Sequence, residues 1–429
     1  MMKQFWLLEF FTVKRYIALH PISRSIMFKK LSIPCVFIIL TSCSDTRPFL
    51  KEGGGATFGQ HADRPNTTDV LTFYALGDWG TGNQNQKAVA KALRKNISEL
   101  PPGRKVPPFV LGLGDNVYEE GLPEGFDNPG ALEKLRRSFG EIYSEVEYGD
   151  EAVMFHIIPG NHDHAGKAGG KHGVGDVIHQ ETTAERLYDT WHYYPIDPEK
   201  NSDSEDARNY RDLKSENILS LATPEKIAAV SSKTLAVFAL DTQVLLTLYE
   251  EKDAERLALH WRKLREQVEI SPAVWTLIIG HHPVRSHGKH GGFRNWVWYV
   301  PPVILVTLVD KFFHKRVQDL DHPANRAFQK DLIDFMAQHE VDFYLAGHEH
   351  NLQFLTMEAN RFQIVSGSAG KLSGVTHKND TLFSHASFGF VRFDLTGREL
   401  WVEFFEVAPD QETYRSSGLF KLLKTGERR

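Results

Sequence analysis

The sequence predicts an α/β protein in which crossover helices cover a sheet. Two observations predict this class. From residue 70 onward, short apolar runs alternate with stretches of helical periodicity, and most of the runs end at a glycine or proline followed by a polar side chain. The chain has 429 residues, 41% hydrophobic and 24% charged, so it can bury a substantial core. Disordered and fibrous classes are therefore excluded.

Six apolar runs are expected to form buried strands, because they are short, mostly apolar, and bounded by turn residues. They are residues 71–76, 109–113, 153–158, 235–240, 275–279 and 341–346. Later runs at 362–365, 388–393 and 400–407 predict further strands.

Three stretches place apolar residues at helical spacing and predict amphipathic helices that cover the sheet. They are residues 84–100, 253–269 and 325–340. No internal repeat and no linker composition interrupts residues 70–415, which indicates one catalytic domain at 70–409. Residues 410–429 are polar with scattered basic side chains, and we expect a loosely held tail there.

Charge and histidine content narrow the function classes. The formal net charge is -5, and no long lysine and arginine block is present, so nucleic acid is not expected as a partner. The chain holds 20 histidines, and several stand beside aspartate, asparagine and glycine at the ends of apolar runs. This placement indicates metal chemistry.

The N-terminal segment predicts export. A basic Phe28-Lys29-Lys30 follows Met27, and the apolar run 31–40 is too short to span a bilayer as a stable helix. Its end, Leu40-Thr41-Ser42-Cys43, resembles the lipobox of bacterial lipoproteins, in which the cysteine is diacylated and becomes the mature N-terminus. We therefore expect residues 1–43 to be an extension and lipoprotein signal.

The N-terminal residues also predict the start of translation, a tether and the location of the protein. Translation is expected to begin at Met27, which the N-terminus of the precursor would test, and residues 44–69 have the composition of a tether. Cys35 and Cys43 are the two cysteines, too few for a disulfide framework. The protein would be a cell-envelope lipoprotein of the periplasm or outer surface, attached to the membrane through Cys43. The alternative is a plain cleavable signal and a secreted soluble protein.

Five short motifs follow predicted strands. The carboxyl ends of strands in an α/β sheet meet at one edge, so we expect these polar side chains to converge. A glycine before each polar residue lets the chain turn sharply and approach an ion. The motifs are Gly77-Asp78-Trp79-Gly80, Gly114-Asp115-Asn116-Val117-Tyr118, Gly160-Asn161-His162-Asp163, Gly280-His281-His282-Pro283 and Gly347-His348-Glu349-His350.

This ordered set resembles the calcineurin-like metallophosphoesterase superfamily, and Tyr118, three residues after Asp115, resembles the purple acid phosphatases. The tartrate-resistant branch is indicated by Gly-Asn-His-Asp-His-Ala-Gly at 160–166, by Ala-Leu-Asp-Thr at 239–242, and by His290 nine residues after His281. The resemblance covers about 71–407. It implies a four-layer α/β/β/α sandwich, two mixed sheets flanked by helices, with a dinuclear site at the C-terminal ends of the strands.

The resemblance also implies a ligand set. A trivalent iron would bind Asp78, Tyr118 and His350. A divalent iron, zinc or manganese would bind Asn161, His281 and His348. Asp115 would bridge the two ions, and a metal-bound hydroxide would cleave phosphate monoesters. Hard anionic oxygens suit the more highly charged ion, which agrees with this division.

The resemblance assigns protonation of the leaving group to His162 and His290, and His287 could exchange roles with His290. Asp163 is expected to act in catalysis by orienting the imidazole of His162. Further basic side chains are either phosphate contacts or solvated cations. These are His164, Arg285, Lys289 and Lys371.

Two features depart from the pattern. His282 stands where the resembling enzymes often have an aromatic or small residue, so the pocket wall is expected to differ. The apolar segment 293–313 has no counterpart in the family core. It is either a buried insertion or a lid, with residues 296–309 facing the membrane.

Three functions remain open at this stage. The first is a phosphomonoesterase acting on a small-molecule phosphate ester. The second is a phosphodiesterase or nucleotide-pyrophosphate hydrolase on the same scaffold. The third is a non-catalytic surface-binding lipoprotein, which predicts lost ligands, whereas all seven positions are intact.

Overall fold

The computed structural model groups Ser44–Arg429 into one compact unit, distinct from Met1–Cys43. Cys43 lies outside the described residues, and so do residues 294–315, which include all of the apolar segment 293–313 except its first residue. The predictions for them stay predictions. Within the described part of the chain, no helix is long and apolar enough to cross a membrane. The structure describes residues 47–51, 67–122, 128–164, 177, 180, 183–184, 186–194, 218–220, 234–293, 316–408 and 413–424.

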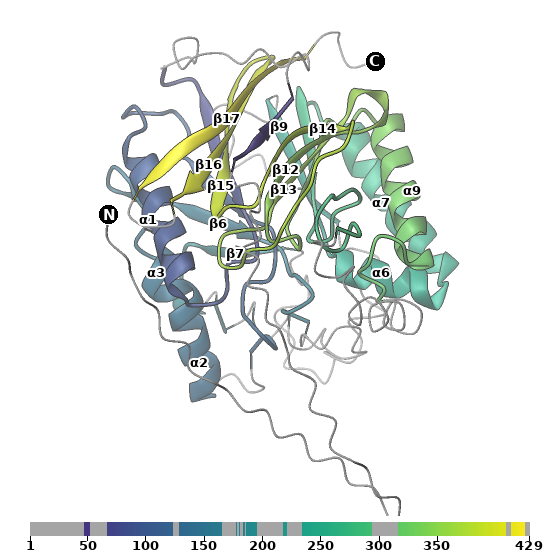
Figure 1. Ribbon diagram of the computed structural model, residues 1–429, viewed down its shortest axis with the longest axis horizontal. Coiled ribbons are helices and arrows are strands. Elements are labelled where there is room, and N and C mark those ends of the chain that lie inside the picture. Colours follow the sequence, from purple (N-terminus) through teal and green to yellow (C-terminus); the bar gives the residue numbers. More distant parts are fainter. Residues whose placement is uncertain are drawn as a thin grey trace, which may run out of the picture. The chain divides into compact units, whose positions relative to one another are not determined.

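One layer is a seven-stranded mixed sheet (Figure 1). Its order is β17 (Tyr414–Leu423), β16 (Glu399–Val407), β15 (Gly389–Thr396), β2 (Leu71–Leu76), β3 (Phe109–Gly112), β6 (Met154–Ile157) and β7 (Trp191–Tyr193). Strands β2, β3, β6 and β7 run parallel, so their carboxyl ends lie at one edge. A separate two-stranded hairpin joins β4 (Glu147–Tyr148) and β5 (Glu151–Ala152).

The second layer is an eight-stranded mixed sheet. Its order is β1 (Phe49–Leu50), β14 (Thr381–His385), β12 (Leu352–Thr356), β13 (Phe362–Ser366), β11 (Phe343–Ala346), β10 (Trp275–Ile279), β9 (Leu235–Leu240) and β8 (Ile218–Ser220). Its central strands β9, β10, β11 and β13 are parallel.

Strand alternation builds the core between the two sheets. In β2, Leu71, Phe73 and Ala75 point into the cluster shared with the other sheet, whereas Tyr74 and Leu76 point toward the helices. Both faces are buried, which explains why the run is apolar apart from Thr72, whose hydroxyl donates to Asp394.

Helices cover the outer face of each sheet, as Figure 1 shows. On the seven-stranded sheet lie α1 (Gln84–Ser98), α2 (Pro129–Leu135) and α3 (Glu141–Tyr143), with a π-helical turn at Arg136–Gly140. On the eight-stranded sheet lie α6 (Thr242–Glu251), α7 (Ala254–Ile270) and α9 (Pro323–Gln338). The predicted four-layer sandwich is confirmed.

The six predicted buried strands are β2, β3, β6, β9, β10 and β11, and the three predicted helices are α1, α7 and α9. Side-chain caps set the helix starts: Asn83 accepts from the Gln86 amide, and Asp253 from the Arg256 amide. Helix α6 was not predicted. It begins directly after β9, where the Asp241 side chain accepts from the amides of Gln243 and Val244.

The described residues add two strands at the expected ends of the domain. Residues 410–429 were expected to be a tail, but β17 pairs antiparallel with β16 along its whole length. The reason is Phe420, which is 1% exposed and lies in the core between the sheets. The tether expected at 44–69 contains β1, where Phe49 stacks on His377 at 3.9 Å between ring centroids.

Replacing Phe420 by alanine should lower the free energy of unfolding by about 3–5 kcal/mol, because it opens a cavity against Phe354, Phe383 and Phe404. Urea denaturation measures the change. Leu423→Ala on the same strand is the control, since Leu423 is 62% exposed and its loss should stay within about 0.5 kcal/mol. If both substitutions change the free energy of unfolding equally, Phe420 is not packed in the core and the C-terminal segment is a loosely held tail.

Candidate metal centre

The polar residues of the five motifs come together at one end of the sandwich. Asp78, Asp115 and Asn161 follow the neighbouring parallel strands β2, β3 and β6 of one sheet. His281 and His348 follow the neighbouring parallel strands β10 and β11 of the other. Because both sheets present carboxyl ends here, loops distant in sequence meet at one site.

A first group of ligand atoms lies around Asn161 Oδ1. This oxygen is 3.1 Å from His281 Nε2 and 3.0 Å from His348 Nδ1, and the two ring nitrogens are 3.3 Å apart. Asp115 Oδ1 is 3.3 Å from His281 Nε2. Ligands about 2.1 Å from a common ion are about 3.0–3.4 Å from one another, so these spacings suit a single cation.

A second group lies beside the first. The Tyr118 hydroxyl oxygen lies 3.1 Å from Asp78 Oδ1 and 2.8 Å from Asp115 Oδ2, and its single hydrogen can be donated to either carboxylate. His350 Nε2 is 3.4 Å from Asp78 Oδ1. Asp115 therefore places one carboxylate oxygen in each group, which is the arrangement of a bridging ligand.

The donor chemistry fits metal ions. His281 Nδ1 lies 2.8 Å from the carbonyl of Leu113 and donates to it, which leaves Nε2 as an acceptor. This lone pair faces the oxygens of Asn161 and Asp115, so acceptors converge in a buried site that a cation would satisfy. Ligand atoms of Asp78, Asp115 and His281 all lie within 4.8 Å of one another.

Burial sets the protonation states of these groups. Desolvation raises the pKa of Asp78 well above its ordinary value. Burial also acts to raise the pKa of Asp115, but His281 and His162 reverse the effect and hold it below its usual range. Burial lowers the pKa of His350 to about 4 and that of His348 well below its ordinary value, so both imidazoles are neutral and able to bind a metal.

Three ligands have left-handed backbone conformations. The φ angles are +57° at Asp78, +56° at Asp115 and +66° at His348. Aspartate and histidine are among the non-glycine residues that occur there more often, yet each such position costs on the order of 1–3 kcal/mol. Surrounding contacts must therefore hold these three ligand loops in place.

Glycines make room for the ligands. A Cβ atom on Gly160 would lie 2.2 Å from Asp115 Oδ1. A Cβ atom on Gly114, whose φ is +87°, would lie 2.6 Å from His281 Nδ1. The glycine that precedes Asn161 and the one that precedes Asp115 are therefore required by close approach to the neighbouring ligand.

Asp163 does not orient His162, contrary to the expectation. Its buried carboxylate accepts hydrogen bonds from the backbone amides of Asn116, Val117 and Gly160 and from the side chains of Asn116 and Gln180. Burial, followed by Asp115, raises the pKa of Asp163 to about 6. Asp163 thus joins the loops that carry Asp115 and Asn161, because unpaired amides there attract its side chain.

His162 lies at the opening beside Tyr118. Its ring is 4.5 Å from the Tyr118 ring between centroids, and its backbone amide donates to Asp115 Oδ1 at 2.9 Å. The Nδ1 atom contacts the Glu119 carbonyl, and Nε2 is 4.0 Å from Asp115 Oδ2. The side chain is 21% exposed, so it can reach a substrate at the centre.

His290 lies on the other side, and the structure distinguishes it from His287. The ring of His290 is 4.1 Å from that of His348 between centroids, and its Nδ1 is 3.1 Å from Asp319 Oδ1. His287 instead places Nε2 2.7 Å from Asp380 Oδ1. His290 is therefore the member of this loop that faces the metal ligands.

Of the other basic side chains predicted as phosphate contacts, Lys371 lies beside Tyr118, whereas His164 does not. Lys371 lies 3.5 Å above the centroid of the Tyr118 ring and pairs with Glu119 at 2.8 Å. His164 Nε2 is 2.9 Å from Asp241 Oδ2, deep in the protein.

Arg285 and Lys289 have no contact with the ligand groups among the described residues, whereas His282 lies beside one of them. Arg285 pairs with Glu358 and donates to the Thr356 carbonyl, and Lys289 is exposed. His282 is fully buried, with its ring 4.5 Å from that of His348 between centroids, so it does form part of the wall around the ligands.

Two residues of the site were not singled out from the sequence. Asp319 lies 29 positions after His290, beyond the apolar segment, and stands in no motif. Glu349 was visible inside its motif, but its role was not. Its Oε1 accepts from Ser286 Oγ and from the amides of His290 and Gly291, at 2.8 to 3.1 Å.

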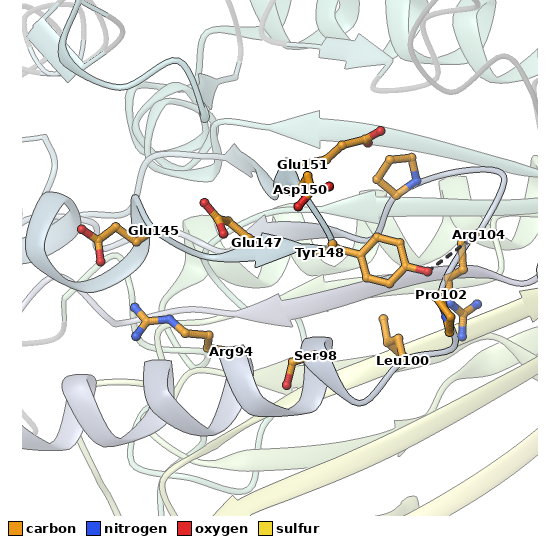
Figure 2. A pocket seen from close by; sticks show the side chains of 13 residues that line it. Arg94, Ser98, Leu100, Pro102, Arg104, Glu145, Glu147, Tyr148, Asp150 and Glu151 are labelled. Carbon is orange, nitrogen blue, oxygen red and sulfur yellow. Dashed lines mark hydrogen bonds between the residues drawn. The ribbon is translucent and has the colours of Figure 1, made fainter.

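A surface cavity of about 740 Å³ lies away from this centre (Figure 2). It is lined by Leu100, Arg104 and Pro107, which precede β3, and by Tyr148 of the β4–β5 hairpin. These residues stand at the opposite ends of the strands from the ligands. None of the predicted ligand or catalytic residues lines the cavity, so we do not regard it as the catalytic site.

The fold and the paired ligand groups define a metallophosphoesterase. A sequence model of the calcineurin-like phosphoesterase family matches residues 71–352, more than half of the chain, and the protein belongs to this family.

Curated relatives point to the acid phosphatases. Tartrate-resistant acid phosphatase type 5 of Sus scrofa is 24% identical over 381 residues, which cover 82% of this chain and 88% of the relative. Purple acid phosphatase 4 of Arabidopsis thaliana is 22% identical over 369 residues, which cover 81% of this chain and 83% of the relative. The chain is thus a distant relative of the purple acid phosphatases over most of its length, as the motifs indicated.

Solved structures agree on the fold. The yellow lupin purple acid phosphatase PPD1 superposes with a TM-score of 0.50 at 14% identity, covering 84% of this chain and 55% of that one. GAP50, titled the anchor in the inner membrane complex of Plasmodium, has a TM-score of 0.51 at 18% identity, with 84% and 90% covered. At these identities the likeness shows the fold alone.

The shared position of Asp115 generates a prediction about metal content. Asp115→Ala should reduce two bound ions per chain to none after dialysis, because each ligand group loses an anionic oxygen. Mass spectrometry of the metals measures this. His287→Gln is the control and should keep both ions, since His287 pairs with Asp380 instead. Two ions retained by Asp115→Ala would show that the carboxylate does not serve both groups.

Proposed function

We propose that the protein hydrolyses phosphate monoesters at a dinuclear centre that pairs a trivalent iron with a divalent iron, zinc or manganese. The observation that carries this proposal is the position of Asp115, with one oxygen in each of two ligand groups. Bound there, two cations would polarise the phosphoryl oxygens and activate water by lowering its pKa. The family and its acid phosphatase relatives support the reaction class.

The charges of the site favour a monoester dianion over a diester monoanion. Asp78, Asp115 and Tyr118 bring three negative charges when ionised, against about five positive charges of the two ions. About two positive charges remain, or one when a hydroxide is also bound, so a phosphate dianion is attracted more strongly than a diester monoanion. The buried imidazoles and the amide of Asn161 add no charge.

Two histidines flank the ligand groups and can serve the leaving group. His162 beside Tyr118 and His290 beside His348 are 21% and 15% exposed, whereas the side chains of Asp115 and His281 are almost fully buried. Each directs one ring nitrogen to a partner in the protein and leaves Nε2 free to hold a proton near the substrate. Closely packed side chains at the base of the site exclude bulk water from the ligands.

Turnover of two aryl substrates separates this proposal from the diesterase alternative. We expect kcat/KM for p-nitrophenyl phosphate to exceed that for bis(p-nitrophenyl) phosphate roughly tenfold or more, because a dianion is attracted more strongly than a monoanion to the positive charge of the two ions. Steady-state kinetics with purified residues 44–429 measures both. Preference for the diester would overturn the monoesterase proposal and leave the family assignment standing.

Tyr118 provides a separate test of iron. A phenolate bound to trivalent iron gives a visible charge-transfer absorption band, so the purified protein should be coloured and Tyr118→Phe should lose the band while metal analysis still finds iron. His164→Gln is the control and should keep the band, because His164 pairs with Asp241 rather than with the ligands. A colourless protein that holds two zinc or manganese ions would remove the iron assignment and leave a metal-dependent esterase.

A further inference from the structure

Asp319 and His290 form a pair at the edge of the metal centre that no sequence motif indicated. The Asp319 Oδ1 atom is 3.1 Å from His290 Nδ1, and the two side chains are 32% and 15% exposed. An ionised carboxylate only accepts hydrogen bonds, so Nδ1 must carry the hydrogen. Among the described residues, Nε2 of His290 has no hydrogen-bond partner.

The ring of His290 is held against the ligands. It lies 4.1 Å from the ring of His348 between centroids, with an angle of 36° between the planes. With Nδ1 paired to Asp319, the free Nε2 lies on the far side of the ring from this carboxylate. The ring therefore has one edge anchored and the other available to a substrate beside His348.

The backbone of His290 is fixed independently of its ring. Glu349 stands between the ligands His348 and His350, and its Oε1 accepts from the amides of His290 and Gly291 at 2.8 and 3.1 Å. The loop that carries His290 is thus tied to the loop that carries two ligands. With the backbone held in this way, the remaining freedom is rotation of the ring, which the Asp319 contact removes.

We propose that Asp319 is a positioning residue, which holds the Nδ1–H of His290 toward its own carboxylate and so orients Nε2 toward the leaving-group oxygen. This inference rests on the proposed ester hydrolysis. Water forms a new P–O bond and gives a proton to solvent, while the ester P–O bond breaks and leaves its electron pair on the leaving oxygen. The proton on Nε2 of cationic His290 transfers to that oxygen. Neutral His290 then regains a proton from solvent, and Asp319 remains ionised throughout.

The same loop offers a matched control. His287 and Asp380 form a second histidine and carboxylate pair, at 2.7 Å, with the side chain of His287 6% exposed. This pair joins the loop to the residues before β14 and does not involve the metal ligands. Asp380→Asn removes the same charge from the same kind of contact, so it reports the structural effect alone.

Leaving-group dependence tests the proposal. We expect Asp319→Asn to lower kcat for an alkyl phosphate such as ethyl phosphate about 100-fold, but that for p-nitrophenyl phosphate less than about fivefold, with KM little changed. The reason is that an alkoxide needs a proton to leave, whereas nitrophenolate does not. Asp380→Asn should affect both substrates equally. An equal loss on the two substrates in Asp319→Asn would overturn the proposal.

Nitrogen NMR of the His290 ring tests the role of Asp319 without measuring turnover, so it applies even if the wild type prefers another ester. The ¹⁵N chemical shifts of the His290 ring, assigned by comparison with His290→Gln, should show hydrogen on Nδ1 in the wild type and a mixture of tautomers in Asp319→Asn. If the wild type cleaves diesters only, the proposed function fails, and the alkyl and aryl comparison is made with diesters. An unchanged tautomer in Asp319→Asn would overturn the positioning role, whichever ester is cleaved.

Discussion

The structure depends on one buried carboxylate that two groups of ligands share. Asp115 follows β3, which lies between the parallel strands β2 and β6, and its two oxygens face His281 on one side and Tyr118 on the other. Acceptor atoms converge on this point with few donors to balance them. Such a cluster is unfavourable in a protein interior unless cations occupy it. The fold therefore makes sense as a scaffold for two ions, and the strained φ angles of three ligands agree with that view.

Two acidic residues that are not themselves proposed ligands hold the ligand loops in place. Asp163 joins the loops after β3 and β6 by accepting amide hydrogen bonds from both. Glu349 stands on the loop after β11 and accepts amide hydrogen bonds from His290 and Gly291 on the loop after β10. In both cases a carboxylate replaces the regular hydrogen bonding that a turning backbone loses. Each sheet thus carries its own brace next to the ligands.

Much of the fold and the ligand set could be predicted from the sequence, for a physical reason. Buried parallel strands are visible in the sequence as short apolar runs. Candidate ligands such as Asp78 and His281 stand directly after these runs, so the same pattern predicts both the strands and the site. The position of Asp319 could not be predicted, because its pairing with His290 crosses an insertion and depends on tertiary geometry. Strand β17 was missed because its apolar residues form a short run between polar stretches, and only packing shows that Phe420 enters the core.

The contact between the His348 amide and Asp78 Oδ2, at 2.7 Å, joins residues separated by 270 positions. Closing so long a loop is entropically expensive, and contacts of this kind form late when a chain folds. The ligand set draws on loops from both sheets, so it is complete only when both sheets are formed. Misfolded or half-synthesised chains would lack the full ligand set, so ions would be captured by finished molecules in preference to immature ones.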